Sequence, residues 1–307
     1  MVAVLLAQQI FQLFLMMLCG YLLVRLNVLK SSDSKPLSVL LVYLITPCTI
    51  LNAFQIEYSA EKASGFIMAI LSGLMIHVLL FVIVYALSRV FRFTNVEKAS
   101  LIYSNAGNLI IPLVTAILGE EWVIYASAFM VVQQFIIWTH GKSLIQGKTG
   151  ADFKAILLNV NLIACVAGMI MFLLHLHLPS LLGGTVKSMA SVIGPVSMIM
   201  IGMILAGTDL KSIVKGKRIW IIAVLKMIII PMIILVIMKY SGFSRFAADG
   251  VTILYISLMA TMTPSASTVT QMAQLYDQDA GTATAINTIT TLMCIATMPL
   301  LTMIYYL

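Results

Sequence analysis

The chain has 307 residues, of which 61% are hydrophobic and only 9% are charged, and its mean hydropathy is +1.07. Soluble domains average roughly 45–50% apolar and about 25% charged residues, so this chain has too little polar surface for a soluble globule. The composition therefore places it in a bilayer. Its formal net charge of +7 comes from single basic residues and small clusters between apolar runs, a pattern that indicates membrane sidedness rather than nucleic-acid binding.

Long apolar runs follow one another along the whole chain. A helix needs about 20 apolar residues to cross the hydrocarbon core, so each run of this length predicts a membrane span. The ten predicted spans are Val4 to Val24, Leu37 to Phe54, Phe66 to Val90, Ala99 to Leu118, Trp122 to Thr139, Ala155 to Leu178, Met189 to Gly207, Ile219 to Met238, Val251 to Leu275 and Thr282 to Tyr306. The first is expected to be a retained span, because no basic segment typical of a signal peptide precedes it. The sequence thus predicts an all-α integral membrane protein.

Lys and Arg are unequally distributed over the predicted loops. The loops after spans one, three, five and seven hold 13 of them, and one more, Lys226, lies inside span eight. The opposite side has four: Lys62, Lys187, Lys239 and Arg245. Short loops rich in Lys and Arg stay in the cytoplasm, so a multi-pass protein of the plasma (inner) membrane with both termini outside is expected.

Helix-breaking residues recur at about half the chain length. Pro47 and Pro195 are 148 residues apart, and Pro112 and Pro264 are 152 apart. Ten spans divide into five plus five, and an odd number of spans inverts the second half, so the spacing favours an inverted repeat. The predicted organisation is a first five-helix repeat over residues 1–140, a cytoplasmic linker over 141–154 and a second five-helix repeat over 155–307.

Spans four and nine occupy equivalent places in the two halves, and both contain polar and helix-breaking residues. Span four reads SNAGNLIIP from Ser104 to Pro112, and span nine reads TMTPSAST from Thr261 to Thr268. Proline removes a backbone donor and clashes with the preceding turn, so both helices are expected to kink or unwind there. Paired discontinuities point to a transporter's midplane site. The alternative is a pair of Pro-kinked packing helices with satisfied polar side chains.

Two such half-helix ends would direct unpaired N–H groups, with partial positive charge, into a cavity of low dielectric. This arrangement suits an anion, and the expected substrate is a small organic anion, a weak carboxylic acid. Four side chains are expected to hold its carboxylate, and the backbone at two prolines is expected to assist. The side chains are those of Asn105, Asn108, Ser265 and Thr268, and the prolines are Pro112 and Pro264.

Two ionisable residues fall inside predicted spans, His77 in span three and Lys226 in span eight. Intramembrane charge is costly, so Lys226 is a candidate for the substrate site, but snorkelling toward the cytoplasm is an equal alternative. His77 is expected to be a hydrogen-bonded packing residue, and Gln133 and Gln134 in span five are expected to join helices. All eleven Asp and Glu lie in loops or at span ends, which argues against cation coupling through a buried carboxylate.

The sequence offers no motif for an enzyme. Gly141-Lys142-Ser143 lacks the first glycine of a phosphate loop, and His175 and His177 would point apart on a helix. The four cysteines lie in apolar runs and are expected to be inert hydrophobic residues. No enzymatic activity, cofactor or metal is therefore expected.

The chain resembles the auxin efflux carrier family, which includes the plant PIN carriers and bacterial malate- and malonate-type permeases. The resemblance is carried by the stretch from Asn105 to Pro112, by Thr263-Pro264, by Tyr276 and by the span-ten segment ending Met298-Pro299-Leu300. It implies a five-plus-five inverted repeat in which the broken helices four and nine cross, a scaffold domain and a transport domain, and elevator-type alternating access. It also places Asn105 in the substrate site. Val269 departs from the PIN pattern, which has a second proline there.

The function expected from these features is a secondary carrier of small organic anions, such as auxin-like or other carboxylic acids. The lipid bilayer is its expected surrounding, nucleic acid is not an expected partner, and a homodimer stays open. The alternative is a membrane channel or receptor that uses the same crossed helices without alternating access.

Overall fold

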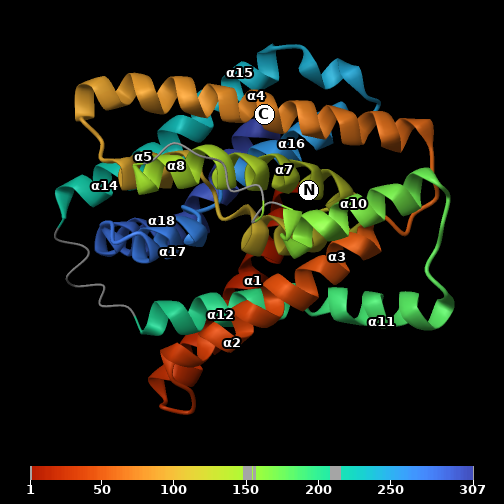
Figure 1. The fold of residues 1–307 in the computed structure, drawn as a ribbon, viewed down its shortest axis with the longest axis horizontal. Coiled ribbons are helices and arrows are strands. Elements are labelled where there is room, and N and C mark those ends of the chain that lie inside the picture. The colour runs from red at the N-terminus through yellow and green to blue at the C-terminus, as the bar shows by residue number, and fades with distance from the viewer. Residues whose placement is uncertain (1, 148–153, 155–156, 208–215, 307) are drawn as a thin grey trace. The chain divides into compact units, whose positions relative to one another are not determined.

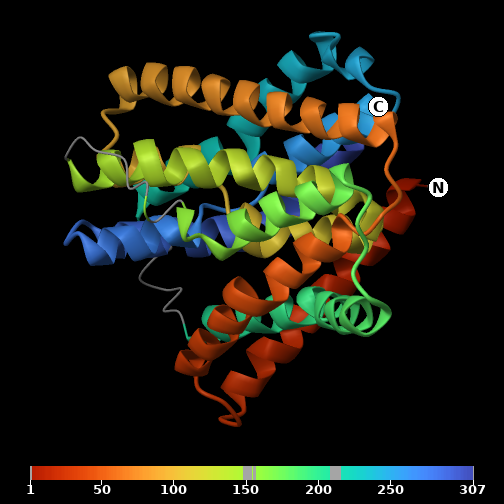
Figure 2. The same ribbon diagram turned by 45° about the vertical axis from the view of Figure 1, so that its right-hand side comes forward.

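The computed structural model describes residues 2–147, 154, 157–207 and 216–306, and the regular elements in this part of the chain are all helical (Figures 1 and 2). Six of the described helical segments are long and apolar enough to cross a membrane. They are Ser31–Ala53, Ala60–Phe91, Glu120–Gln146, Ser180–Ala206, Lys217–Tyr240 and Ala280–Tyr306. These segments coincide with predicted spans two, three, five, seven, eight and ten, so the structure is that of an all-helical, multi-pass membrane protein.

The remaining four predicted spans contain other helices. Helix α1 (Val2–Arg25) covers span one, and α10 (Val160–Leu173) covers the middle of span six. Spans four and nine are each divided. Span four contains α5 (Asn95–Ile102) and α6 (Ile111–Ile117), and span nine contains α16 (Gly250–Thr261) and α17 (Ser267–Leu275).

The chain folds into two compact units. Unit 1 contains Met1–Ala63, Gly107–Ser127 and Leu158–Asp209, and unit 2 contains Ser64–Ala106, Ala128–Leu157 and Leu210–Leu307. Each unit therefore combines segments of both predicted repeats.

Unit 1 contains α1, α6 and α10 together with four further helices. These are α2 (Ser34–Leu40), α3 (Thr46–Ala53), α11 (Ser180–Ser191) and α12 (Ile193–Ala206). Helices α1 and α12 pack closely against each other because glycines lie at the contact. A Cβ atom at Gly20 would overlap the carbonyl oxygen of Ile199, and one at Gly202 would overlap that of Met17. Small residues thus let the two backbones approach, as is common between membrane helices.

Predicted span seven begins earlier than expected. The apolar run predicts a start at Met189, whereas helix α11 begins at Ser180. Lys187, which was counted as a loop residue, therefore lies on a helix with its side chain exposed. The prediction was wrong because hydropathy marks the apolar part of a helix, whereas backbone hydrogen bonds continue the helix through its polar turns.

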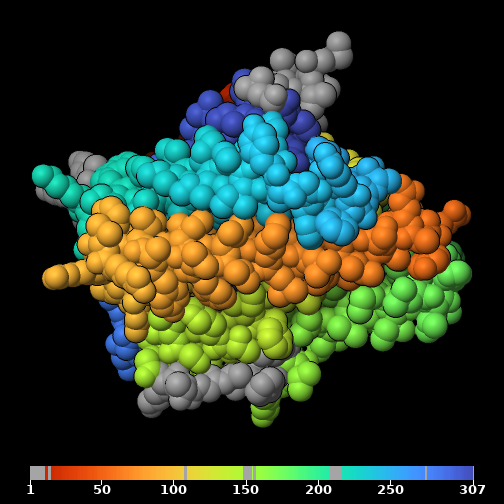
Figure 3. Space-filling view, turned by 90° about the horizontal axis from the view of Figure 1, so that it is seen from above, coloured from red at the N-terminus to blue at the C-terminus, as the bar shows by residue number. Residues whose placement is uncertain are grey.

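Unit 2 contains α5, α16 and α17 and most of the long helices. The others are α4 (Ala60–Phe91), α7 (Val123–Ile136), α8 (Lys142–Gln146), α14 (Lys217–Val224), α15 (Ile230–Tyr240) and α18 (Ala280–Tyr306), of which α4 and α7 begin in unit 1. Helix α4 is apolar on two opposite faces. One face is buried and includes Ile76, Leu80 and Val84, whereas Ile67 and Val82 on the other are 59% and 63% exposed. Helix α4 forms an uncovered band in Figure 3, as expected for a helix that contacts lipid.

Wide π-helical turns precede three of the prolines. The turns Leu41–Ile45, Ala106–Ile110 and Leu225–Ile229 each end two residues before a proline. The prolines are Pro47, Pro112 and Pro231, and each lies in the first two positions of the α-helix that follows. Proline lacks an N–H and crowds the carbonyl one turn earlier, so a widened turn lets the helix continue past it. Proline thus marks an irregular turn here without ending the helix.

The close contact between α1 and α12 at these glycines should contribute to stability. Gly202→Ala is expected to lower the free energy of unfolding by about 1–3 kcal/mol, because the added methyl group forces α1 away from α12. Gly194→Ala, on the same helix, is the matched control, since a Cβ atom there meets no heavy atom within 4 Å. Thermal unfolding in detergent measures both. Equal unfolding midpoints for the two variants would contradict the close-packing explanation.

Candidate functional site

Two segments of unit 2 leave the helical conformation inside predicted spans four and nine. The first break, residues 103–105, follows α5, and the second break, residues 262–266, lies between α16 and α17. Tyr103 has extended backbone angles, φ −91° and ψ 132°. The stretch Ser104–Pro112 predicts a kink or an unwound segment, and the extended residues lie at its beginning, whereas Pro112 is inside α6. Pro264, in contrast, lies within its break.

The two breaks pair with each other through their backbones. Ser104 and Ser265 form an antiparallel bridge. The Asn105 N–H donates to the Pro264 carbonyl at 2.8 Å, and the Ala266 N–H donates to the Tyr103 carbonyl at 3.0 Å. In this kind of antiparallel pair, the peptide groups of the two facing residues point away from each other. The backbone groups of both serines therefore need partners elsewhere.

Side chains from two neighbouring helices supply those partners. Gln133 of α7 accepts from the Ser104 N–H at 3.1 Å and donates to the Ser104 carbonyl at 2.7 Å. On α18, the Thr290 hydroxyl accepts from the Ser265 N–H at 3.1 Å, and the Asn287 amide donates to the Ser265 carbonyl at 2.7 Å. Every peptide group of the paired serines is thus satisfied, as an apolar surrounding requires.

Sequence reasoning found only part of this arrangement. It assigned Gln133 to joining helices, and the structure shows this residue linking α7 to the first break. It missed Asn287 and Thr290. The signal was available, because both are polar, lie three residues apart and therefore share one face of span ten.

Each of the two breaks has a polar side-chain group without a hydrogen-bond partner among the described residues. The Ser265 hydroxyl is buried and has no hydrogen-bond partner in the described part of the chain, and the side-chain amide of Asn105 is half-buried and makes no hydrogen bond to a described residue. Thr268 is half-buried in the first turn of α17. Asn105 and Ser265 are in the paired segments and Thr268 is three residues after Ser265, so three of the predicted residues lie at or next to the breaks in unit 2.

The other predicted site residues are placed differently. Pro264 accepts the hydrogen bond from Asn105 with its carbonyl and is buried. Pro112 is buried in α6 and belongs to unit 1. The side chain of Asn108 lies outside the described part of the structure.

Lys226 reaches the first break from the π-helical turn Leu225–Ile229. Its side chain is 1% exposed, and its ammonium group donates to the Leu101 carbonyl at 3.0 Å and to the Ser104 hydroxyl at 2.8 Å. The ammonium group is therefore buried in unit 2 and does not reach a surface by snorkelling. Among the described residues, Lys226 contacts no carboxylate, and the atoms that accept hydrogen bonds from its ammonium group are neutral oxygens.

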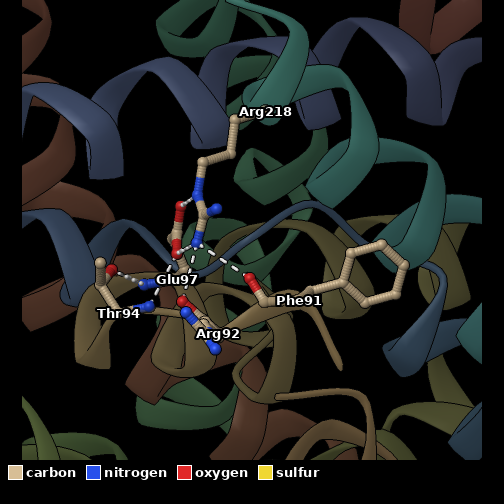
Figure 4. Close-up of polar contacts among 5 residues, drawn as sticks. All are labelled: Phe91, Arg92, Thr94, Glu97 and Arg218. Atoms are coloured by element: carbon tan, nitrogen blue, oxygen red, sulfur yellow. Dashed lines mark hydrogen bonds and ion pairs between the residues drawn. The ribbon is translucent and has the colours of Figure 1, made fainter. Parts of the chain in front are cut away.

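A residue of α14, Arg218, contacts the N-terminal end of α5. Thr94 and Glu97 form a capping box at the N-terminus of α5. Figure 4 shows the Arg218 guanidinium group directed at the Glu97 carboxylate, with Nη2 2.8 Å from Oε2 and 2.9 Å from the Arg92 carbonyl. Burial raises the pKa of Glu97, but the hydrogen bonds from Arg218 and Thr94 outweigh burial and leave this pKa below its ordinary value. Glu97 therefore stays ionised at neutral pH.

His77 on α4 is buried, as expected for a packing residue. Its Nδ1 atom lies 2.7 Å from the Gly73 carbonyl, and its ring packs against Phe129 at a centroid distance of 5.2 Å. Within the described ranges, His, Cys, Asp and Glu side chains form no group of three that could hold a metal ion.

Comparison with known proteins bears on this arrangement. A search of curated proteins finds no match to the chain. A family model described as "membrane transport protein" matches residues 5–155 and 150–302. The two matches together cover almost the entire sequence, and the family is the one that the sequence resembles. The chain therefore belongs to the membrane transport protein family of auxin efflux carrier-type permeases.

Proposed function

We propose that this membrane transporter is a secondary carrier of small organic anions, with the substrate carboxylate bound beside the two paired breaks. The observation that carries the proposal is the buried ammonium group of Lys226, which lacks a carboxylate partner among the described residues. A buried positive charge is costly, and an anion near it reduces that cost.

The groups next to this charge suit a carboxylate. The Ser265 hydroxyl and the side-chain amide of Asn105 have no hydrogen-bond partner among the described residues, and each can donate a hydrogen bond. The N-terminal turn of α17 begins two residues after Ser265, and the N–H groups of such a turn carry partial positive charge. Neutral donors of this kind bind an anion without a direct ion pair, which favours release.

We infer that unit 2 is the transport domain and unit 1 the scaffold of an elevator-type carrier. Unit 2 contains both breaks, Lys226 and the helices that hold them, so the proposed site residues Asn105, Ser265, Thr268 and Lys226 would move together. The backbone pairing of the breaks supports the proposal that helices four and nine cross. The order of interrupted helices in the two halves supports the five-plus-five inverted repeat.

The alternative is a channel or receptor that uses the same pair of breaks. A channel would conduct anions continuously and show no exchange of substrate across the membrane. The carrier is favoured because the proposed site residues Ser265 and Lys226 are almost completely buried.

Binding of organic acids to an Asn105→Ala variant tests the proposed site. Removal of a hydrogen bond to a charged group costs about 1.5–3 kcal/mol, so the dissociation constant is expected to rise tenfold or more. Ligand-induced shifts in thermal unfolding, measured against a panel that includes malate and indole-3-acetate, give the affinities. Gln134→Ala is the control, since Gln134 lies on α7 beside Gln133 but makes no hydrogen bond to either break. Unchanged binding by Asn105→Ala would remove this residue from the site, and a panel without any ligand would contradict the substrate class.

The proposed orientation, with both termini outside the plasma (inner) membrane, has its own test. Ser32 and Ser180 are both exposed, and the positive-inside distribution places Ser32 in the cytoplasm and Ser180 outside. In a background without the four native cysteines, Ser180→Cys is expected to react with a membrane-impermeant maleimide in intact cells. Ser32→Cys is expected to react only after the cells are opened. The reverse pattern would invert the topology.

A further inference from the structure

The C-terminal end of α5 leaves carbonyl oxygens without helical partners. The Leu101 carbonyl would normally accept from the N–H four residues later, but that N–H belongs to Asn105 and donates to Pro264 instead. Unpaired carbonyls at a helix C-terminus carry partial negative charge. With the nearby Ser104 hydroxyl, they form a position at which oxygen atoms favour a cation.

The ammonium group of Lys226 occupies this position. It donates to the Leu101 carbonyl and the Ser104 hydroxyl at 3.0 and 2.8 Å, and it is almost completely buried. Carbonyl and hydroxyl oxygens are also ligands of free metal cations. The Lys226 ammonium group, which is part of the chain, therefore occupies a position whose oxygen ligands also suit a free cation.

Two contacts with α5 fix the position of this ammonium group. Arg218 and Lys226 are eight residues apart, and α5 is eight residues long. Eight helical residues extend about 12 Å, so Arg218 can hold the N-terminal end of α5 through Glu97 while Lys226 holds its C-terminal end. The two contacts set the position of the ammonium group along α5, next to the first break.

We propose that Lys226 is a tethered cation: it occupies the oxygen-lined position at the end of α5 and replaces a free cation, so that the breaks pair without sodium. This inference deepens the proposed carrier function, on which its consequence for transport rests. That consequence is uptake of organic anions without a sodium requirement. The structural part of the inference concerns the folded protein alone.

Thermal unfolding of the full-length Lys226→Ala variant in detergent tests the tethered cation. The substitution removes the equivalent of n-propylammonium, so choline, sodium and n-propylammonium chloride are compared at equal concentration and without organic acid. The unfolding midpoint of the unsubstituted protein is expected to be the same in all three salts. The midpoint of Lys226→Ala is expected to be lower in choline, and to rise by about 2–4 °C in n-propylammonium or sodium, with saturation.

Lys239→Ala is the matched control. The Lys239 ammonium group donates to the Tyr305 carbonyl at 3.1 Å, but its contact is only partly buried. This contact is less buried than that of Lys226, so the midpoint of this variant is expected to be equal in the three salts. A rise of the same size in Lys239→Ala would show a general salt effect and overturn the proposal.

A second variant, Lys226→Ser, also leaves the position of the ammonium group empty, but it puts a polar side chain in place of the methyl group of alanine. If neither Lys226 variant responds to the cations, or if neither folds even in n-propylammonium, the tethered cation is wrong. Stabilisation of the unsubstituted protein by sodium would also contradict it. The cation test contains no organic acid and does not depend on the carrier function. If Lys226→Ala responds to cations but no organic acid binds in the separate panel, only the carrier function is refuted.

Discussion

Ser104 and Ser265 lie opposite each other where two helices of unit 2 are interrupted, and hydrogen bonds on either side join the two backbones. An extended backbone inside an apolar structure is tolerated only where its polar groups find partners. This requirement explains why Gln133, Thr290 and Asn287 all direct their side chains to the same two residues. These three polar residues of spans five and ten therefore support the breaks.

The position of α5 links this support to the proposed chemistry. Arg218 and Lys226 hold its two ends, and Lys226 brings a positive charge to within one residue of Asn105. The charge is stabilised by a helix end and a hydroxyl, and a carboxylate is not among its described contacts. The proposed site would keep a net positive character, which would favour anions over neutral or cationic substrates. The same ammonium group supplies the cation that the helix end requires.

The sequence predicted the all-helical membrane fold and the places of the two interruptions, because apolar runs and polar or helix-breaking residues are local signals. Within the stretch Ser104–Pro112 it could not choose the unwound residues, since the π-helical turn before Pro112 accommodates the proline and the chain becomes extended earlier, at Tyr103. The direction of Lys226 could not be chosen from its place in span eight. That choice depends on a contact with Leu101 and Ser104, which are far away in the sequence.

Substrate exchange in liposomes tests the central claim, that the paired breaks bind and carry an organic anion. The purified protein is reconstituted, the vesicles are loaded with unlabelled malate or indole-3-acetate, and entry of the same labelled acid is followed in sodium and in choline medium. The account predicts that internal acid accelerates entry, that entry saturates, and that the two media give equal rates. Entry that ignores internal acid, or that requires sodium, would contradict it.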